Sequence, residues 1–328
     1  MTEAIDSGCV RLGLASEGSR VSEVRVSSER PSLTGTLRGR PAADAVRLVP
    51  LLFALCGQAQ GGAAALALAA ARGTGCAAHL DAAIQTEVMR EHLWRWLLDL
   101  PLLLGEAALR EEFVAAMGWL GGGRRDELAA MLAGSRVEAL RRRVCDMEDL
   151  PDPAPSLLPA LDAQSSLALW PQLDSGFCRR PHWRGAAAET GAIARRRGRT
   201  DALSDAKAGH AAFAARWLAR LDELREWAAG MATVGAGGTA SAASTAAGRG
   251  RALVETARGL LMHEIVLDGE RIADYFIVAP TEWNFHPQGR LAGWLTGRDA
   301  TDRAAVQRFA ARAVAALDPC VRWELEWL

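Results

Sequence analysis

The chain has 328 residues and half of them are apolar, which is enough to bury a sizeable core in one large domain or two ordinary ones. Arg and Lys total 38 against 39 Asp and Glu, so the formal net charge is −1. A balance this even gives no electrostatic argument for nucleic acid or an anionic membrane as a partner.

Six cysteines are scattered along the chain, and no two of them form a C-x-x-C pair. A disulfide framework is not expected in a chain this long that begins with the polar, acidic sequence MTEAIDSGC rather than an export signal. We therefore expect a cytoplasmic protein. Residues 48–71 carry no charge, but their glycines, glutamines and alanines favour a helix buried in protein over a membrane span.

The first hundred residues predict a β-hairpin followed by helices. Residues 10–28 alternate apolar and polar positions on either side of a turn, which is typical of two paired strands. Residues 42–55 and 63–72 are predicted to be helical, and the glycine-rich segment 56–62 between them is predicted to bend. An amphipathic pattern over residues 80–100 predicts a longer helix.

The middle of the chain predicts more helices and a proline-rich connection. Residues 107–120 and 124–148 are predicted helices, separated by three glycines. The connection over residues 150–185 begins with LPDPAPSLLP, whose prolines do not suit a regular helix. Residues 205–229 predict another amphipathic helix, and residues 230–250, rich in Gly, Ala and Ser, predict a flexible linker.

The last part of the chain predicts a return to β structure. Residues 260–279 alternate around an Asp-Gly turn, and residues 299–317 predict a final helix. The whole pattern is that of an α+β protein that is mainly helical, with small β elements near the N-terminus and in the C-terminal part.

Five patches, in order along nearly the whole chain, resemble the large subunit of NiFe-hydrogenases. The patches are the hairpin with Leu55-Cys56-Gly57, the segments WRG and ETGAIAR within residues 183–195, ETARG at 255–259 with His263, DYFIVAPTEWN at 274–284, and Asp318-Pro319-Cys320. They are similar to the family patterns R-x-C-G-x-C, W-x-G with E-x-G-P-L-A-R, E-A-P-R-G, N-Y-x-x-V-x-P and D-P-C-x-x-C. The resemblance implies a shortened large-subunit-like fold in which residues 1–328 form a single domain.

Two departures from the family bear directly on metal binding. In the family, four thiolates hold nickel, and the second cysteine of each C-x-x-C pair also bridges to iron. Here the second cysteines are replaced by Ala59 and Trp323, while the first ones remain as Cys56 and Cys320. Soft thiolates fix nickel in such a site, and two of four do not reproduce it. We therefore expect no nickel and no enzymatic activity.

Other features of an active hydrogenase are also missing. The family histidine after the first cysteine pair falls near Ala63, and a proton-relaying glutamate falls near Ser7. Serine cannot act as a carboxylate acid or base. The chain closes with WELEWL, without the histidine and the cleaved peptide that follow this segment in the family, so we expect no proteolytic processing.

The residues that remain point to an iron site. Arg258, Pro280 and Thr281 match residues that contact the cyanide ligands of iron in the family. An arginine fork and a hydroxyl are suitable donors to cyanide, and both gain strength in a dry cavity. The alternative is that Arg258 is an ordinary ion-paired arginine, for example with Glu255, and Thr281 an ordinary loop residue. His263 is expected to be a satisfied core histidine rather than a metal ligand.

The pattern is similar to the HupK/HoxV type of hydrogenase accessory protein. That resemblance implies a maturation scaffold that holds iron as Fe(CN)2CO and passes it on. We expect Cys56 and Cys320 to meet inside the fold as a two-thiolate clamp, with Arg258 and Thr281 lining the same pocket. A carrier must bind its cargo more weakly than the acceptor does, and two thiolates in place of four meet that need.

The expected partners follow from the same resemblance. They are hydrogenase maturation proteins, namely a small iron-carrying chaperone with its complex, and the precursor of the hydrogenase large subunit. One alternative is a metal-free chaperone or decoy that binds these proteins through a large-subunit-like surface. A divergent hydrogenase catalytic subunit is the other, and the missing cysteines argue against it. The remaining cysteines, Cys9, Cys76, Cys145 and Cys178, are assigned structural roles.

Overall fold

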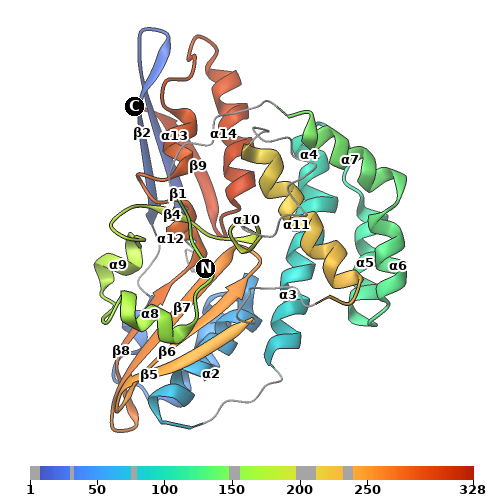
Figure 1. The fold of residues 1–328 in the computed structure, drawn as a ribbon. Helices are drawn as coiled ribbons and strands as arrows, with labels where there is room; N and C mark the ends of the chain where they lie inside the picture. Colours follow the sequence, from blue (N-terminus) through green and yellow to red (C-terminus); the bar gives the residue numbers. More distant parts are fainter. Residues whose placement is uncertain (1–7, 30–32, 75–79, 148–155, 197–211, 232–238) are drawn as a thin grey trace, which may run out of the picture.

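A computed structural model of the chain describes residues 8–29, 33–74, 80–147, 156–196, 212–231 and 239–328. Figure 1 shows two sheets, one above the other, with a lobe of helices packed along their side. The fold is α+β and mainly helical, with one sheet formed at the N-terminus and another in the C-terminal part, which confirms the predicted class. None of the described helices is long and apolar enough to cross a membrane.

The first sheet joins the beginning of the chain to its final strand. β1 (Cys9–Glu17) and β2 (Arg20–Glu29) form the predicted antiparallel hairpin, and β9 (Arg322–Trp327) pairs with β1 in parallel. The sequence reading did not assign β9. Its side chains alternate between exposed and half-buried, so the strand places Trp323, Leu325 and Trp327 against the hairpin core. This pairing fixes the position of the chain directly after Cys320.

The glycine-rich segment after Cys56 is helical, contrary to the predicted bend over residues 56–62. After α1 (Ala43–Leu52), a short 3-10 turn η2 (Ala54–Cys56) redirects the chain, and α2 (Gly57–Ala71) begins at once. The first turn of α2 is stabilised by Glu87, whose carboxylate accepts hydrogen bonds from two of its backbone N–H groups. The glycines permit close packing, because a Cβ on Gly62 would lie 3.1 Å from Ile84 of the next helix.

The second sheet is an antiparallel meander in the order β5-β6-β7-β8. Its strands are β5 (Ala240–Ala246), β6 (Arg249–Thr256), β7 (Gly259–Asp268) and β8 (Arg271–Val278). The predicted linker over residues 230–250 is therefore wrong for its part 240–250, which forms β5 and the start of β6. Residues 232–238 of that linker lie outside the described residues.

Helix α2 lies across the second sheet, and Gly250 makes the contact possible (Figure 1). A Cβ at Gly250 would lie 2.2 Å from the carbonyl oxygen of Ala67, far closer than atoms can approach. Packing against α2 thus places an Ala/Ser-rich segment in a strand although its side chains have little intrinsic preference for one. The predicted burial of the uncharged stretch 48–71 holds for the face of α2 that packs on the sheet, but it is wrong before α2, where Leu51 is 73% exposed and Leu55 is 54% exposed.

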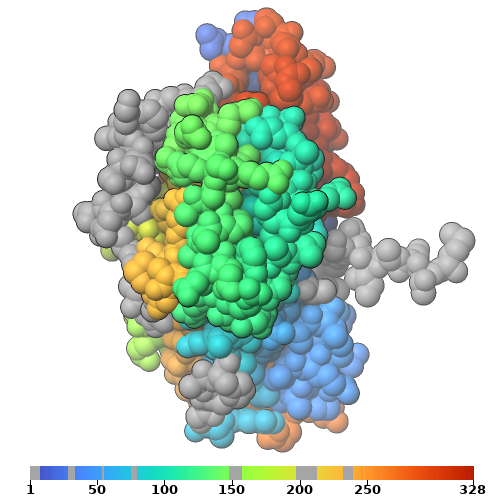
Figure 2. Space-filling view, turned by 90° about the vertical axis from the view of Figure 1, so that its right-hand side faces the viewer, coloured from blue at the N-terminus to red at the C-terminus, as the bar shows by residue number. Residues whose placement is uncertain are grey.

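A helical lobe completes the molecule. It contains α3 (Leu80–Trp94), the π-helical turn η3 (Arg95–Asp99), α4 (Leu100–Leu103), α5 (Arg110–Gly121), α6 (Arg125–Leu132), α7 (Ser135–Cys145) and α11 (Ala212–Ala228). The predicted helix 80–100 is confirmed, whereas the predicted helix 124–148 is broken at Ala133-Gly134. Trp96 and Trp217 meet edge to face in the centre of the lobe. Figure 2 shows α5–α7 covering this face of the molecule.

Short elements connect these units. The connection 150–185 is described from residue 156, with β3 (Ser156–Leu157), α8 (Ala163–Leu169) and α9 (Ser175–Arg179). It is followed by β4 (Ala188–Glu189) and α10 (Ala192–Arg195). The C-terminal part adds α12 (Pro280–Asn284), α13 (Arg290–Leu295) and α14 (Arg303–Leu317), and η1 (Leu33–Leu37) precedes α1.

Candidate metal centre

Cys56 lies at the sharp junction between η2 and α2. It is the residue directly before the first turn of α2, so its sulfur lies near the N-terminal end of that helix. The side-chain amide of Gln60, one turn further on, donates to Cys56 Sγ at 3.5 Å. Glu87 occupies the free backbone N–H groups of the same turn, at 2.8 and 3.0 Å. The junction therefore holds the thiol in a defined place.

Cys320 lies near the C-terminus and is held in place by Thr281 of α12. Helix α14 ends at Asp318, which adopts a left-handed backbone conformation with φ of 56°, and Pro319 prevents the helix from continuing. The hydroxyl oxygen of Thr281 accepts a hydrogen bond from the backbone N–H of Cys320 and lies 3.1 Å from its sulfur. Pro280 begins α12 and presents Thr281 in the first turn of that helix.

The two thiols and Arg258 share one site. Burial, together with the nearby Cys320, raises the pKa of the Cys56 thiol to about 12, although the Gln60 amide and Arg258 oppose the rise. The charge on each group thus acts on the other, although the two cysteines lie at opposite ends of the sequence. Cys56 is therefore within electrostatic reach of Cys320 and Arg258, and Thr281 contacts Cys320.

Arg258 is fixed by two carboxylates, the buried Asp318 and the partly buried Glu91. Its Nη2 donates to Glu91 at 3.0 Å, and its Nε lies 3.3 Å from Asp318 Oδ1. Burial disfavours the charged form, but the negative groups around it raise the pKa of Arg258 well above its usual range. The anticipated partner Glu255 pairs with Arg195 instead, at 2.8 Å. Arg258 is therefore a permanent buried cation beside the two thiols.

More arginines surround the same carboxylate. Arg95 Nη2 lies 2.6 Å from Asp318 Oδ1, and Arg220 donates to the backbone carbonyl of Ala316 at 2.7 Å. The pKa of Asp318 is lowered despite its burial, because Arg258, Arg95 and Arg220 favour its charged form. No described carboxylate lies within ion-pair distance of Arg220, and burial together with neighbouring arginines lowers its pKa to about 10. Three arginines therefore act on the single buried carboxylate of Asp318.

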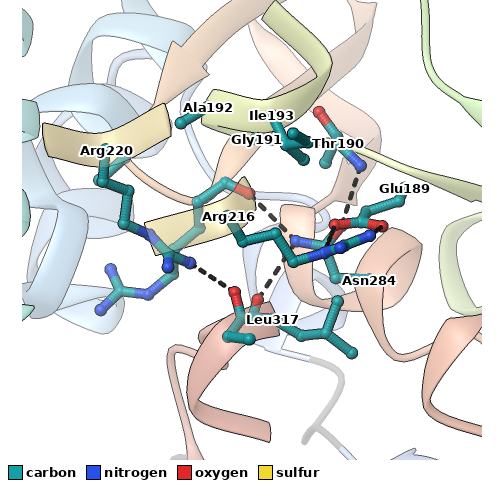
Figure 3. Close-up of a pocket in the computed structure, with 12 residues that line it drawn as sticks. Glu189, Thr190, Gly191, Ala192, Ile193, Arg216, Arg220, Asn284 and Leu317 are labelled. Carbon is teal, nitrogen blue, oxygen red and sulfur yellow. Dashed lines mark hydrogen bonds and ion pairs between the residues drawn. The ribbon is translucent and has the colours of Figure 1, made fainter. Parts of the chain in front are cut away.

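The segment ETGAIAR and the turn that carries Arg258 line a small cavity of about 10 Å³ (Figure 3). Thr190 donates its backbone N–H to Asn284 Oδ1 at 2.9 Å, and Asn284 donates to the carbonyl oxygen of Arg258 at 3.2 Å. Gly259 must lack a side chain, because a Cβ there would lie 2.4 Å from Thr190. The cavity has room for roughly one water molecule. The motif thus positions the turn that carries Arg258.

His263 is a satisfied core histidine, as expected. It is fully buried on β7, with Nδ1 2.8 Å from the hydroxyl of Tyr275 and Nε2 2.9 Å from Gln60 Oε1. Burial lowers the pKa of His263 to about 3, so the ring is neutral. The described residues contain no group of three or more His, Cys, Asp or Glu side chains that could hold a metal ion.

Sequence reasoning missed several residues of this site. Glu91 and Glu87 project from one face of α3, and neither belongs to a motif that would have singled it out. The same is true of Arg95 and Arg220. Asp318 and Asn284 stood inside motifs, and the structure adds their role, which is to hold Arg258.

Comparison with known proteins agrees with this geometry. Residues 192–321 match the nickel-dependent hydrogenase family. The chain superimposes on the NiFeSe hydrogenase of D. vulgaris Hildenborough with a TM-score of 0.67 and 14% identity, over 93% of this chain and 94% of that one. The hydrogenase of Desulfomicrobium baculatum gives 0.58 and 13%, over 94% and 95%. The fold is that of a hydrogenase large subunit, shortened and with two cysteines in place of four.

Sequence relatives narrow this class to a family. The chain is 34% identical to the hydrogenase expression/formation protein HoxV of Cupriavidus necator over 365 residues, covering 92% of each chain. It is 32% identical to the protein HupK of Bradyrhizobium diazoefficiens, which carries the same description, over 94% of each chain. The chain belongs to this HoxV/HupK family of hydrogenase expression/formation proteins.

Proposed function

We propose that the protein acts in hydrogenase maturation as a non-catalytic scaffold that holds an iron unit, Fe(CN)2CO, before it passes to the hydrogenase large subunit. One arrangement supports this proposal: Cys56 lies within electrostatic reach of Cys320 and Arg258, and Thr281 contacts the sulfur of Cys320. The names of the relatives support the broader role in hydrogenase formation. No nickel is expected in the site.

The donor set suits such a cargo. Two thiolates are soft ligands for iron, and they leave other coordination positions for ligands that the iron brings with it. The Thr281 hydroxyl accepts from the Cys320 backbone N–H and lies 3.1 Å from the Cys320 sulfur, so its proton can be donated to that sulfur. Arg258 is anchored by Glu91 and Asp318, so no reorganisation is needed when an anionic ligand arrives. Two protein ligands hold the iron less firmly than four would, which allows transfer.

The test is to purify the protein without oxygen from cells that are making hydrogenase. We expect iron in the sample and infrared bands of iron-bound cyanide and carbonyl. Their absence from protein that nevertheless restores hydrogenase formation in cells would contradict the scaffold.

A metal-free chaperone is the second candidate, and the surface near Cys56 favours it. Leu51 is 73% exposed, Leu55 is 54% exposed and Trp94 is 47% exposed, around the entrance to α2. Leu51 and Leu55 lie within five residues of Cys56, so a partner that binds them would also cover the chain next to this thiol. The partners proposed for this surface are a small iron-carrying chaperone with its complex, and the large-subunit precursor. Full maturation activity in variants that lack Cys56 would favour this candidate.

A further inference from the structure

A continuous chain of buried hydrogen bonds leads away from the sulfur of Cys56. The Gln60 amide lies 3.5 Å from Cys56 Sγ, and its oxygen lies 2.9 Å from His263 Nε2. The other ring nitrogen of His263 lies 2.8 Å from the hydroxyl of Tyr275. All three side chains are 2% exposed or less, so water does not compete for these groups.

The fold builds this chain from three elements. His263 and Tyr275 lie on one face of the second sheet, two register positions apart on the neighbouring strands β7 and β8. Helix α2 crosses that sheet and supplies Gln60, one turn after Cys56. The thiol is therefore connected to the interior of the sheet by side chains that packing holds in place.

The direction of every hydrogen bond follows from the requirement that each buried proton has an acceptor. Burial keeps His263 neutral, with its pKa lowered to about 3, so only one ring nitrogen carries a proton. Burial also raises the pKa of Tyr275, so its hydroxyl keeps its proton. If Tyr275 donates to Nδ1, then Nε2–H donates to the Gln60 oxygen, and the Gln60 NH₂ group faces the sulfur. The reverse order would leave the Tyr275 proton without a partner among the described residues.

We propose that Gln60 is a positioning residue for Cys56, held by His263 and Tyr275 so that its amide N–H points at the sulfur. An N–H that faces a thiolate stabilises the form of cysteine that binds metals and fixes the direction of its lone pairs. The order of the hydrogen bonds rests on the geometry and on a neutral His263 ring, whereas its effect on metal binding rests on the proposed function.

The first experiment measures the tautomer of His263 by ¹⁵N NMR of the full-length, metal-free protein labelled at histidine. We expect a neutral ring with the proton on Nε2 from pH 6 to pH 9. Tyr275→Phe removes the donor to Nδ1 and is expected to change the Nδ1 signal while the Nε2 proton stays on the Gln60 oxygen. A proton on Nδ1 in the unaltered protein would overturn the proposal.

The second experiment uses Cd²⁺ as a probe for thiolates. Gln60→Leu is expected to weaken Cd²⁺ binding about tenfold, because a hydrogen bond to a charged sulfur is lost. Gln60→Glu keeps the acceptor for His263 but turns a negative oxygen toward the sulfur, so it is expected to weaken binding further. Gln58→Leu and Gln58→Glu are the matched controls, since Gln58 lies in the same helical turn with an exposed side chain.

The outcomes separate the positioning role of Gln60 from the proposed two-thiol metal site. Unchanged Cd²⁺ affinity in both Gln60 variants would overturn the positioning role. Failure of the unaltered protein to bind Cd²⁺ would instead contradict the two-thiol site, and the NMR result would still decide the hydrogen-bond order. Tyr275 is the single tyrosine of the chain, so fluorotyrosine gives one ¹⁹F signal, which is expected to shift in Gln60→Leu but not in Gln58→Leu.

Discussion

Trp323 and Ala59 occupy the two positions where the hydrogenase family has its bridging thiols, and both are built into the fold. Trp323 lies in β9 opposite Val10, and Ala59 is fully buried in α2. Neither side chain carries a group that binds a metal, so neither replaces a thiolate. We predict no stoichiometric nickel by elemental analysis and no hydrogen uptake. Nickel near one atom per chain would contradict this prediction.

The two remaining thiols are predicted to act as a unit. Cys56→Ala and Cys320→Ala should each remove the iron and its diatomic ligands, and the double variant should lose no more than either single one. Either sulfur alone leaves the iron with a single protein ligand. Infrared bands and iron content are the measurements, and Cys145→Ala, at a partly buried thiol of α7, is the control. Normal hydrogenase formation with both single variants would rule out the clamp.

Arg258 is predicted to affect both the cargo and the stability of the protein. Arg258→Leu removes one of the arginines paired with the buried carboxylate of Asp318 and should lower the free energy of unfolding by about 3 kcal/mol, since breaking a buried ion pair costs about this much. Arg195→Leu breaks a buried network with Glu223 and Glu255 and is the matched control. Both variants should be less stable in urea. Only Arg258→Leu should shift the cyanide bands or lose iron, and equal effects on iron would count against a direct contact.

The contact between α2 and the second sheet depends on one position without a side chain. Gly250→Ala should destabilise the protein by about 3 kcal/mol or more, because its Cβ would overlap the backbone of α2 at Ala67. Gly118→Ala is the control, since its Cβ meets nothing within 4 Å and alanine favours a helix by about 1 kcal/mol. Urea unfolding measures both. A Gly250→Ala protein of full stability would mean that α2 packs differently.

The periodicity of apolar residues in the sequence predicted the helices and strands that form by local preference. It did not predict the elements whose structure depends on contacts with distant parts of the chain. The hairpin and the helix over residues 80–100 carry their periodicity in the sequence. Strand β5 does not, since it is mostly Ala and Ser, and its structure comes from pairing with β6 beneath α2. The helix over 124–148 divides at Gly134, where a Cβ would lie 3.0 Å from the carbonyl of Met131.

The residues of the candidate site also fall into two groups, those predicted from the sequence and those found only in the structure. Resemblance to the family supplied Cys56, Cys320, Arg258 and Thr281, because these residues stand inside motifs. The partners that fix Arg258 came only with the structure, since Glu91 and Asp318 are separated from it by long stretches of chain. Ion pairs between distant residues leave no periodic signal in a sequence, and only the fold shows which arginine meets which carboxylate.

The whole molecule is predicted to lose stability in mild acid. The pKa of buried His263 is about 3, below the value of roughly 6.5 in an unfolded chain. The unfolded state therefore binds more protons below pH 6.5, so stability is full above that pH and falls as the pH drops toward 3. This loss is about 1.4 kcal/mol per pH unit. Depressed pKa values at Asp318 and Glu223 add to the loss below about pH 4.

Urea unfolding at pH 7.5 and pH 5 measures this slope. His263→Gln should reduce it, and His182→Gln, at an exposed position, should leave it unchanged. Equal stability of the unaltered protein at both pH values would show that His263 is accessible to protons in the folded state.

The parallel pairing of β9 with β1 also sets the order in which the site can form during synthesis. Cys56 leaves the ribosome early, while Cys320 follows every strand of the second sheet and directly precedes β9. For most of its synthesis, a growing chain therefore has Cys56 but not yet Cys320, and its N-terminal sheet still lacks β9. Its clamp closes only after α14 has formed and β9 has returned to the first strand. If the protein carries iron as proposed, a nascent chain offers only half of the site, and we expect loading only after the protein has folded.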